Sequence, residues 1–273
     1  MNSPKPARVL LIVATLGQRP AFLAQTIESI RAQSVPVDLV IVGPIENQDL
    51  RDTSENQNVP LLADPGSLPE AINLGATQIR DHHEFVNWLN DDDLLEPNTL
   101  HTVMEALDTN PTASVAFGHC RYIDAEGKEL WVSKAGKLAP LILPWGPDLV
   151  PQPGMLVRSS AWKRVNGIDP SYSLAFDLDL LLRLKKIGPL IAVNHIVSSF
   201  RWHPDSLTVD DRTKNLKESE QAKRNALPSA LKPISQLWDV PVRWAIRRAA
   251  KRVSTQTQSK NCSRQLKNDE NCG

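Results

Sequence analysis

Three consecutive carboxylates, Asp91, Asp92 and Asp93, directly follow the apolar segment 85–89. Like charges a few ångströms apart raise one another's pKa unless a cation compensates them, so a fold that gathers them has a use for a cation. Oxygen ligands of this type suit Mg²⁺ or Mn²⁺, which commonly bridge one or two carboxylates to the oxygens of a diphosphate. A solvated loop with a helix cap explains the triplet alone equally well.

A second pair of carboxylates, Asp177 and Asp179, opens the apolar segment 177–187 late in the chain. Backbone N–H groups in the first turn of a helix stabilise a carboxylate as an anion. Such an anion can take the proton of a substrate hydroxyl in the role of a general base. A helix N-cap is the simpler explanation of Asp177 when its segment is considered by itself.

The segments before the aspartate triplet alternate between strand-like and helix-like patterns. Continuous apolar runs at 8–14 and 37–42 predict strands, and apolar spacing over 22–33 predicts the helix between them. A strand, helix and strand in this order indicate a parallel sheet covered by helices. A further helix is predicted over 69–80 and a strand over 85–89. The triplet therefore lies just beyond a strand's carboxyl end, where open α/β sheets bind ligands.

The second half of the chain continues the α/β pattern. Helices are predicted at 98–107, 160–165 and 177–187, strands at 114–122, 129–132, 155–158 and 191–202, and an irregular proline-rich loop at 140–153. The expected fold class is α/β, with a Rossmann-like, mostly parallel central sheet flanked by helices and a C-terminal helical appendage. We place the catalytic domain at 1–210, because the composition becomes polar and basic beyond Asp210.

The motif 88–97, Trp-Leu-Asn-Asp-Asp-Asp-Leu-Leu-Glu-Pro, resembles the acidic donor-site motif of the family 2 glycosyltransferases, which have the GT-A fold. The segments 15–33 and 65–75 are similar to the family's first helix and to its loop and helix before the acidic motif. Gln152 and the segment 177–183 resemble its acceptor side. The resemblance covers about residues 8–208 in order. It implies a donor half at about 8–97, an acceptor half at about 98–210, and transfer of a sugar with inversion.

The resemblance assigns roles around the acidic motif. It implies that Asp93 is the metal ligand, that Asp92 contacts the ribose or assists at the metal, and that Asp91 is chiefly a spacer on the cofactor side. Asn90 stands where the family often has Asp. His203 corresponds to a late histidine that can complete the metal site, although a lone histidine is more often structural.

The nucleotide side of the site is implied in the same way. Thr15 and Arg19 occupy positions where the family contacts the nucleotide, and Asn73 lies on a helix expected to face the donor pocket. Many members end the second strand with an acidic residue that binds uracil or ribose. This chain has Val42-Gly43-Pro44-Ile45-Glu46 there, and Glu46 is the candidate substitute.

On the acceptor side, the resemblance makes Asp177 the catalytic base and Asp179 the alternative. Phe176 replaces the Glu that precedes the base in the family. The expected donor is a nucleotide sugar, UDP- or dTDP-linked, and the expected acceptor is a glycan or a lipid-linked hydroxyl in surface polysaccharide or glycolipid synthesis. The expected cofactor is Mn²⁺ or Mg²⁺.

Composition and charge limit the expected partners and the expected cellular location. Lys plus Arg equals Asp plus Glu at 31 each, so the chain has no overall bias towards polyanions, and we expect no nucleic acid partner. Three cysteines without paired spacing suit a reducing cytoplasm. The basic amphipathic segment 236–253 suits either a helix packed on the core or an anionic membrane surface, such as the inner face of the plasma membrane. The end of the extension 211–273 is polar enough for disorder.

Two other functions use similar residues. Nucleotidyl transfer onto a sugar phosphate also needs aspartates and Mg²⁺, but it normally has a glycine-rich basic loop, of which 15–20 is a poor version. A non-catalytic nucleotide- or carbohydrate-binding protein would tolerate Asn90 and the missing acidic residue after Val42. His82 and His83 precede a strand and are expected to face solvent.

Overall fold

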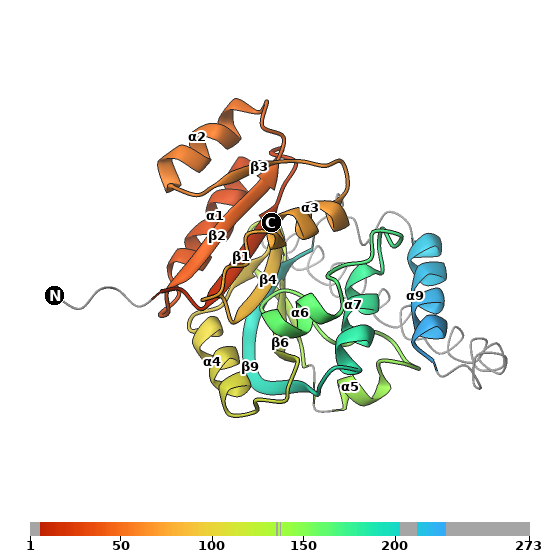
Figure 1. Ribbon diagram of the computed structural model, residues 1–273. Coiled ribbons are helices and arrows are strands. Elements are labelled where there is room, and N and C mark those ends of the chain that lie inside the picture. The colour runs from red at the N-terminus through yellow and green to blue at the C-terminus, as the bar shows by residue number, and fades with distance from the viewer. Residues whose placement is uncertain (1–5, 135, 137, 203–211, 228–273) are drawn as a thin grey trace, which may run out of the picture.

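The computed structural model describes residues 6–134, 136, 138–202 and 212–227 (Figure 1). Within them, a nine-stranded sheet has the order β3-β2-β1-β4-β8-β6-β9-β5, with β7 paired to β6. The strands are β1 (Val9–Ala14), β2 (Val37–Gly43), β3 (Leu61–Ala63), β4 (Phe85–Asn90), β5 (Leu94–Leu95), β6 (Val115–Ile123), β7 (Glu129–Ser133), β8 (Leu156–Arg158) and β9 (Leu190–Arg201). The longest ladders pair β1 with β2, β1 with β4, and β6 with β9, and all three are parallel. The predicted α/β class with a mostly parallel sheet is therefore confirmed.

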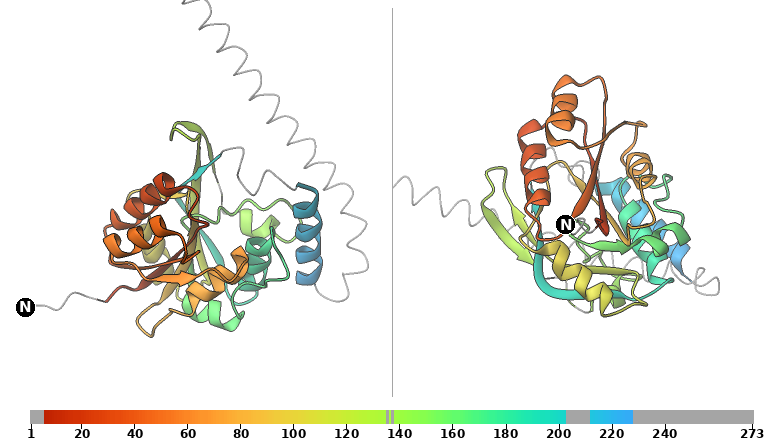
Figure 2. Two further views of the ribbon diagram at one scale, coloured as in Figure 1. Left: turned by 90° about the horizontal axis from the view of Figure 1, so that it is seen from above. Right: turned by 60° about the vertical axis from the view of Figure 1, so that its left-hand side comes forward.

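Helices cover both faces of the sheet (Figures 1 and 2). They are α1 (Pro20–Arg31), α2 (Gln48–Gln57), α3 (Leu68–Ala76), α4 (Thr99–Asp108), α5 (Ala139–Ile142), α6 (Ser159–Arg164), α7 (Phe176–Lys185) and α9 (Arg212–Ala226). Successive strand residues point to opposite faces. Leu11 of β1 accordingly packs in the cluster containing residues of α1 and α4, and Ile12 packs in the cluster containing residues of α3, α6 and α7. Burial on both faces explains why β1 reads as an unbroken apolar run.

Three elements of the first half, α2, β3 and the two-residue strand β5, escaped sequence prediction. Helix α2 is strongly polar and buries only Leu50 among its ten residues, so it lacks an apolar stripe. Strand β3 has three residues, none of them fully buried. The predicted helix over 69–80 ends early, since α3 stops at Ala76.

The loop predicted at 140–153 is not wholly irregular, because α5 begins it with one short helical turn. The predicted helix at 177–187 is α7, and the late strand predicted at 191–202 is β9. Strand β9 lies between β6 and β5, and β5 follows directly after the aspartate triplet. The sheet thereby connects the acidic motif to the second half of the chain.

Helix α9 packs against α7 on the edge of the molecule seen at the right of Figure 1. Its Ala222 is buried in the same core cluster as the leucines of α7. Its Glu218 accepts hydrogen bonds from the backbone N–H groups of Leu174 and Ala175 at 2.7 and 3.1 Å, just before α7 begins. Helix α9 therefore fixes the start of the helix that carries Asp177.

None of the described helices combines the length and the apolar character needed to cross a membrane.

Candidate functional site

The acidic motif lies at the carboxyl end of β4, beside the end of β1, where Ala14 pairs with Asn90. All three aspartates are buried, with Asp93 fully inaccessible. The Thr15 hydroxyl donates a 2.5 Å hydrogen bond to Asp91, and the Gly17 N–H donates to the Thr15 hydroxyl at 2.9 Å. The structure thus brings Thr15 and Asp91 together.

Arg19 supplies positive charge to two of the three aspartates. Its guanidinium donates to the Asp92 carboxylate at 2.5 Å and lies 3.4 Å from Asp91. Burial nonetheless raises the pKa of Asp91. Arg19 is only partly buried, so it can also face a bound anion.

Asp93 has one unsatisfied oxygen. Asn90 donates to its Oδ2 at 3.1 Å, while its buried Oδ1 has no hydrogen-bond partner. Burial raises the pKa of Asp93 well above its ordinary value, and the charge of Asp92 adds to this shift. A divalent cation would stabilise the anionic form and satisfy the orphaned oxygen, so these carboxylates fit the expected metal. This hydrogen bond from Asn90 orients Asp93.

Arg201 ties the acidic motif to the second half of the chain. It is 2% exposed and donates to the Asp92 backbone carbonyl at 3.2 Å and to Gln25 at 2.7 Å. It also donates to the Ala125 carbonyl at 2.9 Å in the turn between β6 and β7, and its guanidinium lies 4.3 Å from the Phe22 ring centroid. No sequence pattern had marked Arg201, because its partners are mostly backbone carbonyls.

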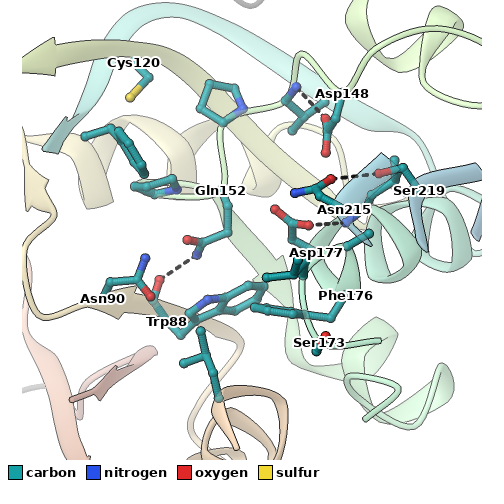
Figure 3. A pocket seen from close by; sticks show the side chains of 18 of the residues that line it. Trp88, Asn90, Cys120, Asp148, Gln152, Ser173, Phe176, Asp177, Asn215 and Ser219 are labelled. Atoms are coloured by element: carbon teal, nitrogen blue, oxygen red, sulfur yellow. Dashed lines mark hydrogen bonds between the residues drawn. The ribbon is translucent and has the colours of Figure 1, made fainter. Parts of the chain in front are cut away.

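A cavity of about 310 Å³ lies next to the acidic motif (Figure 3). Asn90 and Trp88 of β4 line it together with Asp177 of α7. Gln152 lines it as well and donates to the Trp88 carbonyl at 2.7 Å. Residues from both halves of the chain therefore meet in one cavity.

Asp177 is the second residue of α7, whose N-cap position is Ala175. The N-cap explanation of Asp177 is therefore wrong. Its carboxylate accepts the Leu178 N–H at 2.7 Å, and burial raises its pKa to about 6. A carboxyl group with this pKa is ionised near neutral pH while remaining basic enough to accept a proton.

Asp179 is directed elsewhere. Its carboxylate accepts hydrogen bonds from Arg183 at 2.7 Å, and it does not line the cavity. Arg183 also donates to the carbonyls of Val165 and Gly167 at 2.7 Å. The structure therefore places Asp179 in a salt bridge that anchors α7 to the loop after α6.

Asn73 and Glu46 are not gathered around the acidic motif. The Asn73 side chain donates to the Ile168 carbonyl at 2.8 Å and accepts the Ile168 N–H at 2.9 Å, so it fastens α3 to the second half of the chain. Glu46 is exposed in the turn after β2. The residue that contacts the loop after β1 is Asn47, whose amide donates to the Gly17 carbonyl at 3.2 Å. His203 lies outside the described residues.

A separate group of metal-binding residue types lies at the start of β2. The ligand atoms of Asp38, His82 and His83 are within 4.8 Å of one another. Contrary to prediction, His83 is buried, at 4% exposure. Its Nδ1 accepts the Arg80 N–H at 3.0 Å, and its Nε2 lies 2.9 Å from Asp38. In a neutral ring the Nε2 proton therefore points at the carboxylate, which suits a hydrogen bond without a metal. This group lies at the strand ends opposite to the acidic motif.

Comparison with solved structures reveals the same fold in glycosyltransferases. The crystal structure of S. aureus TarS 1–349 matches with a TM-score of 0.63 at 14% identity, over 89% of this chain and 73% of that one. The mannosyltransferase PcManGT from Pyrobaculum calidifontis, in complex with GDP-Man and Mn²⁺, matches with a TM-score of 0.61 at 17% identity, over 91% and 76%. The chain has the fold of these enzymes.

Sequence relatives agree with the fold. Uncharacterised glycosyltransferases of Rickettsia felis and Rickettsia conorii are 22% and 21% identical over 203 residues, which is 67% of this chain. The chain spans about a third of the length of these relatives, at 32%. No family model matches it. Sequence and fold together are glycosyltransferase-like.

Proposed function

We propose that this chain is an inverting glycosyltransferase of the family 2 type, which transfers a sugar from a nucleotide-sugar donor to a hydroxyl of a glycan or lipid-linked acceptor. The observation that carries the proposal is the cavity in which Asn90, next to the acidic motif, and Asp177 both take part. Such a cavity can hold the donor sugar between the diphosphate site and a general base.

Donor binding belongs to the residues at the ends of β1 and β4. Asp93, with support from Asp92, would hold Mn²⁺ or Mg²⁺, and the bound ion would stabilise the negative charge that grows on the diphosphate leaving group. Arg19 would contact the same phosphates, because its guanidinium already lies at Asp92 and is partly exposed. Asn90 holds Asp93 in place.

Acceptor activation belongs to Asp177. Its carboxylate takes the proton of the acceptor hydroxyl as that oxygen attacks the anomeric carbon. The bond from the anomeric carbon to the phosphate oxygen breaks on the opposite face, and its electron pair leaves with the diphosphate. Attack opposite to the leaving group inverts the configuration.

The donor is proposed to be UDP- or dTDP-linked. A structure of S. aureus TarS 1–349 in complex with UDP matches this chain with a TM-score of 0.60, whereas the PcManGT complex holds GDP-Man. Thermal shifts with UDP, dTDP and GDP in the presence of Mn²⁺ would identify the base, because a ligand that binds only the folded state raises its stability. Stabilisation by GDP alone would overturn the proposed donor class.

Transfer assays on two variants test the proposal. Asp93→Ala should abolish donor turnover, and Asp177→Asn should lower transfer about a hundredfold or more while nucleotide binding persists. Asp49→Asn, on the exposed polar helix α2, is the matched control. Unchanged transfer in either variant would remove that residue's role. Pyrophosphate release from a nucleoside triphosphate would instead indicate nucleotidyl transfer, and binding without any turnover would indicate a non-catalytic protein.

A cytoplasmic location at a membrane surface is also part of the proposal. Five large apolar side chains are exposed within 138–149, on α5 and on either side of it: Leu138, Leu141, Ile142, Trp145 and Leu149. This apolar patch is fastened to α9, since Lys223 donates to the Gly146 carbonyl at 2.5 Å. The basic amphipathic segment 236–253, which is outside the described residues, follows α9 in the chain. Exposed apolar side chains and a basic segment in the same chain both suit the surface of an anionic bilayer.

A further inference from the structure

We infer that Asp148 is a second acceptor-binding carboxylate and that the cavity accepts an uncharged, hydroxyl-rich group, a neutral sugar ring, while it rejects anionic ones. This inference rests on the proposed function and specifies its acceptor. The sequence had marked neither Asp148 nor the chemistry of the cavity.

The described residues that line the cavity carry two charged side chains, both acidic. Asp148 and Asp177 are the only charged residues among them, and neither Lys, Arg nor His is part of the lining in the described part of the chain. The other lining side chains are either neutral hydrogen-bonding groups or apolar and aromatic ones. A phosphate, sulfate or carboxylate placed here would meet two carboxylates and no cationic side chain among the described lining residues, which disfavours its binding.

Asp148 is held in position by its own loop. Its carboxylate accepts the Val150 N–H at 2.9 Å, and Lys223 of α9 holds the Gly146 carbonyl nearby. Asp148 as a whole residue is exposed, but its carboxyl group lines the cavity. Burial of that group, and after it the charge of Asp177, raises the pKa of Asp148 to about 7. Lys223 opposes this shift. In the view of Figure 3, the side chain of Asn215 lies between the two carboxyl groups.

Neutral hydroxyls fit this arrangement. A carboxylate accepts hydrogen bonds from one or two hydroxyl groups, and Gln152, Asn215 and Ser219 add further donors and acceptors in the lining. The aromatic rings of Tyr122 and Trp202 also line the cavity and can pack against the apolar face of a sugar ring.

The two carboxylates have different tasks in the transfer. The acceptor oxygen forms its bond to the anomeric carbon, its proton passes to Asp177, and the bond to the diphosphate breaks with the electron pair on the departing oxygen. Asp148 accepts a hydrogen bond from a neighbouring hydroxyl of the same acceptor. It is a specificity-determining residue, because it orients one hydroxyl towards the anomeric carbon and repels anions.

Binding of paired probes tests the inference without requiring turnover. The probes are p-nitrophenyl glucoside, galactoside and mannoside together with their 6-sulfates, whose charge is constant between pH 5 and pH 8. Wild-type protein is measured at pH 7.5 with Mn²⁺ and the nucleoside diphosphate that stabilises it. It should bind at least one neutral glycoside about tenfold or more tightly than the corresponding 6-sulfate, as expected for like-charge repulsion. Asp148→Asn should bind the neutral glycoside more weakly, and the preference should shrink at least about fivefold. Asp49→Asn should leave it unchanged.

Three outcomes would overturn the inference: no neutral glycoside binds, the sulfates bind as well as the neutral probes, or Asp148→Asn keeps the wild-type preference. Asp148→Ala is the second variant, and an unchanged unfolding temperature in either one shows that the fold is intact. Donor turnover without acceptor is measured on the same preparations. Normal turnover together with an unchanged preference would reject only the role of Asp148, whereas absence of turnover with every donor would reject the proposed function.

Discussion

Four of the carboxylates in and near the cavity, Asp91, Asp92, Asp93 and Asp177, have four different environments. Asp91 accepts a hydrogen bond from the Thr15 hydroxyl, and Asp92 accepts one from Arg19. Asp93 accepts one from the Asn90 amide and has one oxygen without a partner. Asp177 accepts a backbone N–H at the start of a helix. Identical side chains therefore acquire separate properties from their neighbours. The unsatisfied oxygen supports the proposed metal role of Asp93, and the position in the cavity supports the proposed role of Asp177 as the base.

Replacement of Asp93 by Asn tests the first assignment. The change removes a buried charge whose Oδ1 has no partner, so the variant should lose the Mn²⁺-dependent rise in unfolding temperature that we expect of the wild type. Differential scanning fluorimetry with 0 and saturating Mn²⁺ measures this shift. The control, Asp38→Asn, alters the other group of metal-binding residue types. If that variant lost the shift and Asp93→Asn kept it, the metal would belong to the histidine pair.

The raised pKa of Asp177 predicts opposite pH trends for activity and stability. Transfer should increase with pH around a midpoint near 6, because only the ionised carboxylate accepts a proton. Since the pKa is higher in the folded than in the unfolded state, the stability contributed by Asp177 is present at acid pH and is lost as pH rises through about 6. Asp177→Asn should weaken this loss. Rates and unfolding temperatures measured from about pH 4 to pH 8 check both trends, because the stability changes between the unfolded and folded pKa values. A flat activity profile across pH 6 would contradict the assignment.

At the scale of the elements, α9 determines where α7, the helix that carries Asp177, begins. Glu218 accepts the backbone N–H groups of Ser173, Leu174 and Ala175 and the Ser173 hydroxyl at 2.7 to 3.1 Å. These contacts hold the pKa of Glu218 below its ordinary value, although its burial opposes the shift. A carboxylate that satisfies three N–H groups before α7 orders the backbone that presents Asp177.

Glu218→Ala should therefore slow transfer more than donor hydrolysis. The lost hydrogen bonds should lower the free energy of unfolding by about 2 kcal/mol, measured by urea denaturation. The transfer rate should fall about tenfold, because α7 and with it Asp177 are held less firmly. The rate of donor hydrolysis should change less, because the residues that bind the donor are untouched. Glu220→Ala, two residues away on α9, is the control. Equal losses in hydrolysis and transfer would show that Glu218 serves stability alone.

Sequence periodicity predicted the elements that have strong apolar patterns. Strands β1, β2 and β4 are fully or largely buried, and α1 has a clear apolar face. Their apolar residues therefore predicted which positions are buried. Helix α2 has no such face, and β3 is too short to show alternation. The same reasoning explains why α5 was missed within the proline-rich loop.

The site was predictable only where neighbouring residues form a motif. The aspartate triplet and Asp177 stand in recognisable segments, and the structure places both beside the cavity. Asp148 and Arg201 have no motif, because their partners come from distant elements or from the backbone. Such contacts depend on tertiary structure and leave no local pattern. Asn73 lies on the predicted helix and was expected to face the donor pocket, but its side chain binds the Ile168 backbone, a contact between distant segments that the sequence did not indicate.

At the scale of the whole molecule, the apolar patch on 138–149 lies on the same loop as Asp148, which lines the cavity. Exposed clusters of large apolar side chains commonly mark interaction surfaces. A bilayer at this patch would bring lipid-linked acceptors close to the cavity, since the loop is continuous with its lining. Contact with the bilayer therefore agrees with a membrane-bound acceptor.

Vesicle sedimentation tests this orientation. Leu141 and Trp145 are 64% and 41% exposed, and burial of such a side chain contributes about 2 kcal/mol. The double variant Leu141→Glu/Trp145→Glu should therefore sediment at least tenfold less with vesicles of phosphatidylglycerol and phosphatidylcholine than the wild type. Ile45→Glu, which changes an exposed apolar residue outside the patch, should sediment normally. Equal sedimentation of all three proteins would show that the patch does not contact the membrane. If high salt by itself abolished wild-type binding, that binding would be assigned to the basic segment 236–253.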